Sequence, residues 1–138
     1  LIAEYNPFLL DVEFNTIQKD KKLTAYLKKS KCKLLISWHD FKKTPSDSQL
    51  RTKFNKMRRF SDIVKIVTVA RNVSDASRLL SLYSIKSKNK TIAFCMGEQG
   101  KFSRILCLHL GSPFTYVSLG KAIAPGQFSV DEIKSLSY

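Results

Sequence analysis

The chain has 138 residues, and its 24 Lys and Arg residues against 11 Asp and Glu residues give a net charge of +13. Hydrophobic residues make up 43% of the sequence, which is typical of one folded domain and argues against a disordered chain. No apolar run reaches the roughly 18 residues that a membrane-spanning helix requires, so we expect no membrane partner.

Short apolar runs that predict strands alternate with amphipathic stretches that predict helices. The strands are near-continuous in Val, Ile and Leu, which is typical of parallel strands covered on both faces. This rhythm predicts an α/β fold, either an open doubly wound sheet or part of a (β/α)8 barrel, in a single domain over residues 1–138. The expected strands are residues 8–14, 33–38, 62–69, 90–96 and 113–119, and the expected helices are residues 17–29, 46–59, 74–86, 102–110 and 129–137.

Two of the expected helices carry start signals. Thr44 precedes Pro45, so we expect the Thr44 hydroxyl to cap the second helix with the proline at its first position. Ser129 and Glu132 have the spacing of a capping box at the start of the last helix.

The excess positive charge lies mainly on the predicted helices, in the Lys-rich tracts 19–33 and 53–59. Single-stranded nucleic acid is usually held by aromatic side chains beside such basic residues. Most aromatics here fall at strand ends or on helix faces that look buried. We therefore expect a solvated surface and no nucleic-acid partner.

Three cysteines, Cys32, Cys95 and Cys107, form no CxxC pair and lie at no metal-ligand spacing from a histidine. An odd number of cysteines without such a framework is typical of reduced thiols in a cytoplasmic protein. We expect no metal site.

Lys65 interrupts the β-branched run "DIVKIVTV". If Val64, Ile66 and Thr68 face the helices, Lys65 faces the other side of the sheet. A buried lysine either pairs with a carboxylate or becomes a free amine, and a free amine is the nucleophile that forms Schiff bases with ketones. The alternative is a lysine at an edge position whose ammonium reaches water.

Other polar residues end the predicted strands. His39 and Asp40 close the second strand, Glu13 nearly closes the first, and Arg104 follows the turn after the fourth. The carboxyl ends of parallel strands gather on one side of a sheet, where loops build the site. We therefore expect His39, Glu13 and Arg104 to converge with Lys65.

The sequence blocks resemble a known family, the type I (Schiff-base) 3-dehydroquinate dehydratases. The stretch "DVE" at 11–13 precedes "LLISWHD" at 34–40, with 19 residues between Phe14 and Leu34. Further blocks follow in the family's order, namely "HDFKKTP", "IVKIVTV", "GKFSRIL", "LGSPFTYVSL" and "APGQFSVDEI". The similarity covers essentially the whole chain.

The resemblance implies a role for each matching residue. Lys65 is expected to form an imine with the C3 ketone of 3-dehydroquinate, and His39 to act as the general acid/base. Arg104 and Gln127 are expected to hold the substrate carboxylate, and Glu13 to join the substrate-binding residues. No metal or cofactor is implied. The chain departs from the family pattern at three positions near the expected site, Trp38, Phe94 and Ile123.

The family fold is a (β/α)8 TIM barrel of about 250 residues, and the five units here would be strands 4–8 with their helices. The first three units supply substrate-binding groups in relatives, together with a glutamate that assists the histidine, and they have no counterpart. We therefore expect the C-terminal part of a barrel, inactive until the missing N-terminal barrel portion is supplied. The resemblance also implies a homodimer when complete, and a place in the shikimate pathway of aromatic biosynthesis.

Two alternatives remain open. One is another class I Schiff-base aldolase or lyase on the same barrel. The other is a catalytically impaired half-barrel that acts as a binding or regulatory module, with its basic surface on an acidic partner.

Overall fold

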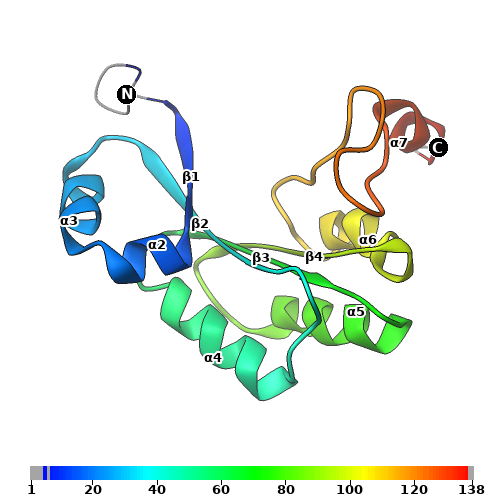
Figure 1. Ribbon diagram of the computed structural model, residues 1–138, viewed down its shortest axis with the longest axis horizontal. Coiled ribbons are helices and arrows are strands. Elements are labelled where there is room, and N and C mark those ends of the chain that lie inside the picture. Colours follow the sequence, from blue (N-terminus) through cyan, green and yellow to red (C-terminus); the bar gives the residue numbers. More distant parts are fainter. Residues whose placement is uncertain (1–4, 6, 137–138) are drawn as a thin grey trace.

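The computed structural model describes residue 5 and residues 7–136, and these form a parallel α/β structure (Figure 1). Four strands pair in the order β1-β2-β3-β4, and every pairing is parallel. The predicted parallel α/β class is therefore confirmed. The strands are β1 (Leu9–Glu13), β2 (Lys33–Asp40), β3 (Ile63–Val69) and β4 (Lys90–Met96). The helices are α2 (Phe14–Lys19), α3 (Lys21–Lys29), α4 (Asp47–Met57), α5 (Val73–Leu80), α6 (Ser103–His109) and α7 (Val130–Leu136), with 3-10 turns η1 (Ser81–Ser84) and η2 (Glu98–Gly100).

One face of the sheet is covered by the helices α2, α4 and α5, which lie below it in Figure 1. Alternate residues of each strand point to this face, among them Ile36, Val64 and Ile66, and all three are fully buried. Burying one such side chain stabilises the fold by roughly 1.5–3 kcal/mol before the entropy of ordering is counted. These helices, together with α3 through Leu27, contribute Phe14, Ile17, Leu27, Leu50, Phe54, Met57, Ala76 and Leu79 to this core.

The opposite face carries a second, smaller apolar cluster near β4. Leu35, Val67, Ile92 and Phe94 pack there with Cys107 of α6. Figure 1 shows α6 beside β4, with the C-terminal segment and α7 on the same side of the molecule, away from β1. Leu35 of β2 belongs to this cluster and Leu9 of β1 packs against it, so the polar side chains of β1 and β2 on this face lie further along both strands, toward their carboxyl ends.

The predicted helix over 17–29 is wrong in one respect, because the structure has two helices there. Asp20 separates α2 from α3 in an extended conformation, and its Oδ1 accepts a hydrogen bond from the Leu23 N–H at 2.9 Å. A short acid that caps a helix start competes with continued helix at that residue.

The predicted fifth strand over 113–119 is also wrong in the described part of the chain. Only an isolated bridge forms there, between Ser118 and Ser129. The Ser118 N–H donates to the Phe128 carbonyl oxygen at 2.9 Å, and the Ser118 carbonyl oxygen accepts from the Val130 N–H. This stretch is therefore engaged by the segment before α7 instead of by a neighbouring strand, and Leu119 is 98% exposed.

The predicted cap of the second helix is displaced by two residues. Ser46, not Thr44, caps α4, and it forms a capping box with Gln49. The Thr44 hydroxyl instead contacts the Thr68 hydroxyl at 2.7 Å and donates to the Val69 carbonyl oxygen at 2.9 Å. A buried hydroxyl needs such partners, and Thr44 meets this need at the end of β3. The capping box of Ser129 and Glu132 is confirmed.

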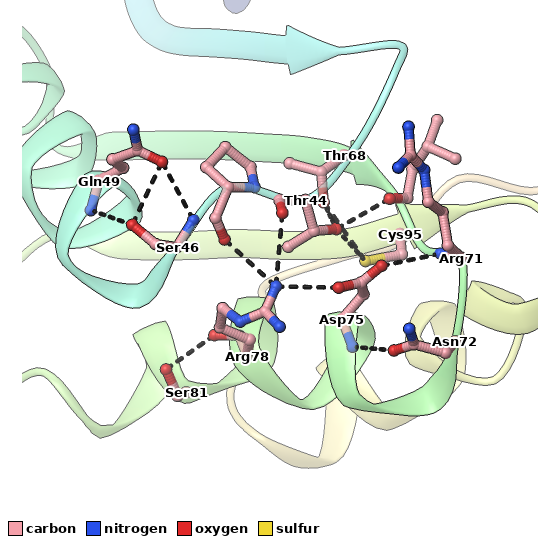
Figure 2. Close-up of polar contacts among 12 residues, drawn as sticks. Thr44, Ser46, Gln49, Thr68, Arg71, Asn72, Asp75, Arg78, Ser81 and Cys95 are labelled. Carbon is pink, nitrogen blue, oxygen red and sulfur yellow. Dashed lines mark hydrogen bonds and ion pairs between the residues drawn. The ribbon is translucent and has the colours of Figure 1, made fainter.

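A polar network joins the loops that follow β2 and β3 (Figure 2). Asp75 in α5 accepts hydrogen bonds from the Arg71 N–H at 3.0 Å and from Nη1 of Arg78 at 2.9 Å. The same Nη1 lies 3.4 Å from the carbonyl oxygens of Thr44 and Pro45. The network fixes both loops at the carboxyl end of the sheet. None of the helices in the described residues is long and apolar enough to cross a membrane.

Candidate active site

Glu13, His39 and Lys65 lie on the sheet face that the α2, α4 and α5 helices leave uncovered, whereas Asp40 lines a groove on the helix side. In the register of the sheet, Glu13 pairs with Ser37 and Ser37 pairs with Lys65. Paired residues point to the same face, and so do residues two apart on a strand. Asp11, two residues before Glu13, and His39, two residues after Ser37, therefore share this face with Lys65.

Lys65 lies on the inner strand β3 and is only 8% exposed. Its Nζ is 2.9 Å from Oδ2 of Asp11 and 4.4 Å from the ring centre of Tyr116. Because β3 has a neighbour on each side, the edge-position interpretation of this lysine is wrong. Lys65 is instead a buried cation held by a carboxylate and an aromatic ring.

His39 lies at the carboxyl end of β2, with its ring on the same face. Its Nδ1 is 2.8 Å from Oε2 of Glu13, and its ring stacks on Phe41 at 5.7 Å between centres. The resemblance implies that the carboxylate assisting the histidine comes from outside this chain, and that Glu13 joins the substrate-binding residues. The structure places the Glu13 carboxylate against His39, which leaves Nε2 as the ring nitrogen not engaged by Glu13.

Arg104 lies in the first turn of α6 and is 3% exposed. Its guanidinium lies over the Phe94 ring at 4.6 Å, and its Nε has no hydrogen-bond partner among the described residues. Burial lowers the pKa of this guanidinium. Phe94 contacts Tyr116 at 5.9 Å between ring centres, so ring contacts connect Arg104 to the Lys65 ammonium. A buried donor without a partner is uncommon and is available to an anion.

Gln127 is not brought into contact with Lys65, His39 or Arg104 within the described residues. Its Oε1 accepts hydrogen bonds from the N–H groups of Ile123 and Ala124, at 3.0 and 3.2 Å. Its side chain thus closes the turn of its own loop, the segment 122–127. We call this segment the APGQ loop.

Two glycines anchor the APGQ loop to the end of β4. The Gly97 N–H donates to the Pro125 carbonyl oxygen at 3.1 Å. Gly126 has φ +69°, and a Cβ on it would lie 2.5 Å from the Gly97 carbonyl oxygen. Only glycine fits this close approach without strain.

The three departures from the family pattern have different placements. Trp38 points to the helix face, opposite to His39, because the two residues are adjacent on one strand. Phe94 lies on the site face and supports the Arg104 guanidinium. Ile123 is 90% exposed on the APGQ loop.

Two groups at this site were missed from the sequence as partners of the catalytic candidates. Asp11 was noted only as part of a motif, although its spacing of two residues from Glu13 puts both acids on one strand face. Tyr116 lies in the stretch that we predicted as a strand, and no sequence signal joins it to Lys65. Tertiary contacts of loops are not encoded in any local pattern.

The thiols of Cys95 and Cys107 are buried, and burial is the main cause that raises the pKa of each. Neither thiol is therefore a thiolate near neutral pH. Within residue 5 and residues 7–136, no group of three or more His, Cys, Asp or Glu side chains is placed to hold a metal ion.

Comparison with known proteins gives consistent matches in sequence and in structure. The chain is 42% identical over 132 residues to the 3-dehydroquinate dehydratase of Pyrobaculum aerophilum. The aligned region covers 94% of this chain and 42% of that protein. The crystal structure of the 3-dehydroquinate dehydratase from Aquifex aeolicus superposes with a TM-score of 0.79 at 32% identity, over 98% of this chain and 61% of the other.

A type I 3-dehydroquinate dehydratase from Clostridium difficile, in a structure with covalently modified comenic acid, gives a TM-score of 0.79 at 28% identity. The superposed region covers 94% of this chain and 53% of the other. The chain thus spans roughly half the length of these relatives. The family profile described as "Type I 3-dehydroquinase" matches residues 1–138. The chain therefore belongs to the type I 3-dehydroquinase family.

Proposed function

We propose that the chain carries the imine-forming half of a 3-dehydroquinate dehydratase, a carbon–oxygen lyase that converts 3-dehydroquinate to 3-dehydroshikimate. One observation carries the proposal. Lys65 in β3 and His39 at the carboxyl end of the adjacent strand β2 share one face of a parallel sheet, and each contacts its own carboxylate. Imine-assisted dehydration requires a nucleophilic amine and a general base on the same side of the active site.

The first proposed step joins Lys65 to the substrate. The Nζ of the unprotonated amine attacks the C3 ketone, a C–N bond forms, and the carbonyl oxygen leaves as water. Asp11 and the Tyr116 ring hold Nζ in place before the attack. The protonated imine withdraws electrons from the adjacent carbon, which makes the C2 proton removable by a base of modest strength.

The second proposed step uses His39 twice. The ring removes the C2 proton, and the same ring then returns a proton to the C1 hydroxyl, which leaves as water. Glu13 on Nδ1 orients the ring and stabilises the positive charge that it acquires between the two transfers. Water then hydrolyses the imine and releases the amine of Lys65.

Arg104 and Gln127 are the proposed ligands of the substrate carboxylate. The Arg104 Nε is buried without a partner among the described residues, and a carboxylate would satisfy it. Gln127 must exchange its loop contacts with Ile123 and Ala124 for the carboxylate. This exchange would couple substrate binding to the position of the APGQ loop.

We further propose that residues 1–138 form one domain, in which β1 to β4 correspond to strands 4–7 of an eight-stranded TIM barrel and residues 113–119 would form strand 8 on assembly. The polar face of the sheet would then line the barrel interior, and the outermost strands β1 and β4 would pair with neighbouring strands. By itself the chain would lack activity. We call the chain combined with the three missing N-terminal βα units the assembled barrel, and we propose that it forms a homodimer in the cytoplasm and acts in the shikimate pathway.

An absorbance assay tests the proposed reaction. The assembled barrel is mixed with 3-dehydroquinate, and formation of the conjugated enone of 3-dehydroshikimate is followed over time. The proposal predicts enone from the assembled barrel and none from the chain alone. Cleavage products without enone would support the aldolase alternative, and binding without either product would support a regulatory half-barrel.

A further inference from the structure

A groove lies on the helix side of the sheet, away from Lys65 and His39. It runs between α2 and α4 over the end of β2, and these elements lie together at the lower left of Figure 1. Its volume of about 460 Å³ is within the roughly 300–1,000 Å³ of sites that hold small molecules. Residues that line it include Phe14, Trp38, Lys43, Lys53 and Lys56. We call it the Trp38 groove.

The charge in the Trp38 groove is net positive, because three lysines and one acid line it. Lys43, Lys53 and Lys56 form no ion pair with the described residues. The acid that lines the groove, Asp40, already accepts hydrogen bonds from the N–H groups of Lys42 and Lys43, at 2.9 and 3.1 Å. The three lysines therefore outnumber the one carboxylate that lines the groove.

An aromatic surface lies beneath these cations. Trp38 is partly exposed, and the Nζ of Lys53 lies 4.6 Å from its ring centre and 5.5 Å from that of Phe14. Cation–π contacts of this kind are weak at exposed sites, and the four-carbon stem of lysine is flexible. The ammonium of Lys53 can therefore move from the indole face to an incoming anion, which exposes the ring for stacking.

We propose that the Trp38 groove binds a small molecule that carries a flat aromatic ring and an anionic group. The ring stacks on the Trp38 indole, and Lys53 and Lys56, one turn apart on α4, contact the anion. An aromatic carboxylate and a mononucleotide share this chemistry. The proposal is independent of the proposed function, because none of these residues lies on the face that carries Lys65.

Calorimetric titration of the full chain distinguishes the two sources. Phenylacetate represents the aromatic carboxylates and AMP the mononucleotides, while acetate supplies the anion alone and benzyl alcohol the ring alone. We expect phenylacetate, AMP or both to bind with a dissociation constant of about 1 mM or tighter, and about tenfold more tightly than acetate or benzyl alcohol. The sequence has one tryptophan, so its fluorescence reports on Trp38 independently.

Lysine variants localise the binding. Lys53→Gln should weaken it about tenfold, because a charge-assisted contact is lost, whereas Lys29→Gln on the exposed face of α3 should leave it unchanged. Lys56→Gln replaces the first variant if circular dichroism shows that Lys53→Gln does not fold. Equal loss in the groove and control variants would overturn the proposal, as would equal affinity for acetate or benzyl alcohol. Absence of saturable binding by both phenylacetate and AMP would also overturn it.

Discussion

The Nδ1 atom of His39 lies 2.8 Å from Oε2 of Glu13, so one contact joins the carboxyl ends of β2 and β1 on the face that carries Lys65. A carboxylate on one ring nitrogen fixes the orientation of an imidazole and directs the other nitrogen outward. The chain therefore supplies both members of a proposed acid/base pair without help from another unit.

Replacing Glu13 with glutamine should slow turnover of the assembled barrel by about 10- to 100-fold, because the amide keeps the size of the side chain but not its charge. Imine formation at Lys65 should persist, since Glu13 does not contact that lysine in the structure. Enone absorbance measures turnover, and borohydride trapping measures the imine. Asp131→Asn in α7 is the matched control, and an equal rate in both variants would contradict the role of Glu13.

Replacing Arg104 with lysine should raise KM for 3-dehydroquinate about tenfold and leave kcat within about threefold. Lysine keeps the charge but loses the planar group that lies over Phe94 and presents several N–H donors. Steady-state kinetics of the assembled barrel measure both constants. Arg51→Lys on α4, where the arginine pairs with Asp47 at the surface, is the control. A fall in kcat with unchanged KM would argue against carboxylate binding by Arg104.

Several features of the fold were readable from the sequence because they depend on local patterns. Apolar runs predicted the four parallel strands. The alternation of side chains along β3 predicted that Lys65 faces the side of the sheet opposite to Val64 and Ile66. The resemblance to the family drew attention to His39. Each of these inferences rests on residues that are close in sequence.

Other features depend on contacts between distant segments and could not be predicted. Thr44 looked like a helix cap, yet its hydroxyl is used by Thr68 and Val69, 24 and 25 residues further along the chain. The stretch 113–119 has the composition of a strand but lacks a ladder partner among the described residues. Its Tyr116 instead covers Lys65.

The network in Figure 2 predicts a pH-dependent contribution to stability. The Arg71 N–H, and after it the Arg78 guanidinium, hold the pKa of Asp75 below its usual value of 3.8 against the opposing effect of burial. A carboxyl with a lowered pKa stabilises the fold above its unfolded pKa, and this contribution is lost as the pH falls through its folded pKa.

Asp75→Asn should therefore lower the free energy of unfolding by roughly 1–3 kcal/mol at about pH 7, and the difference from wild type should shrink below about pH 3.8. Urea unfolding of the chain at several pH values measures this. Asp62→Asn, at an exposed carboxylate, should have little effect at any pH. A difference that is constant with pH would mean that the charge of Asp75 does not contribute.

The APGQ loop should be loosened by Gly126→Ala. The new Cβ would meet the Gly97 carbonyl oxygen at 2.5 Å, and φ +69° adds strain of about 1–2 kcal/mol for a residue with a side chain. Limited proteolysis should cut the loop faster than in wild type. Gly120→Ala, where no atom lies within 4 Å of the added Cβ, should not change the rate. Equal cleavage of the two variants would show that the approach of Gly126 to Gly97 does not anchor the loop.

The most direct test of the account is to trap the imine. The assembled barrel is incubated with 3-dehydroquinate, reduced with borohydride and digested, and the peptides are weighed by mass spectrometry. We expect a substrate adduct on the peptide that contains Lys65, retained in His39→Ala and absent in Lys65→Met. An active enzyme with no adduct at Lys65, or with an adduct on another lysine, would contradict it.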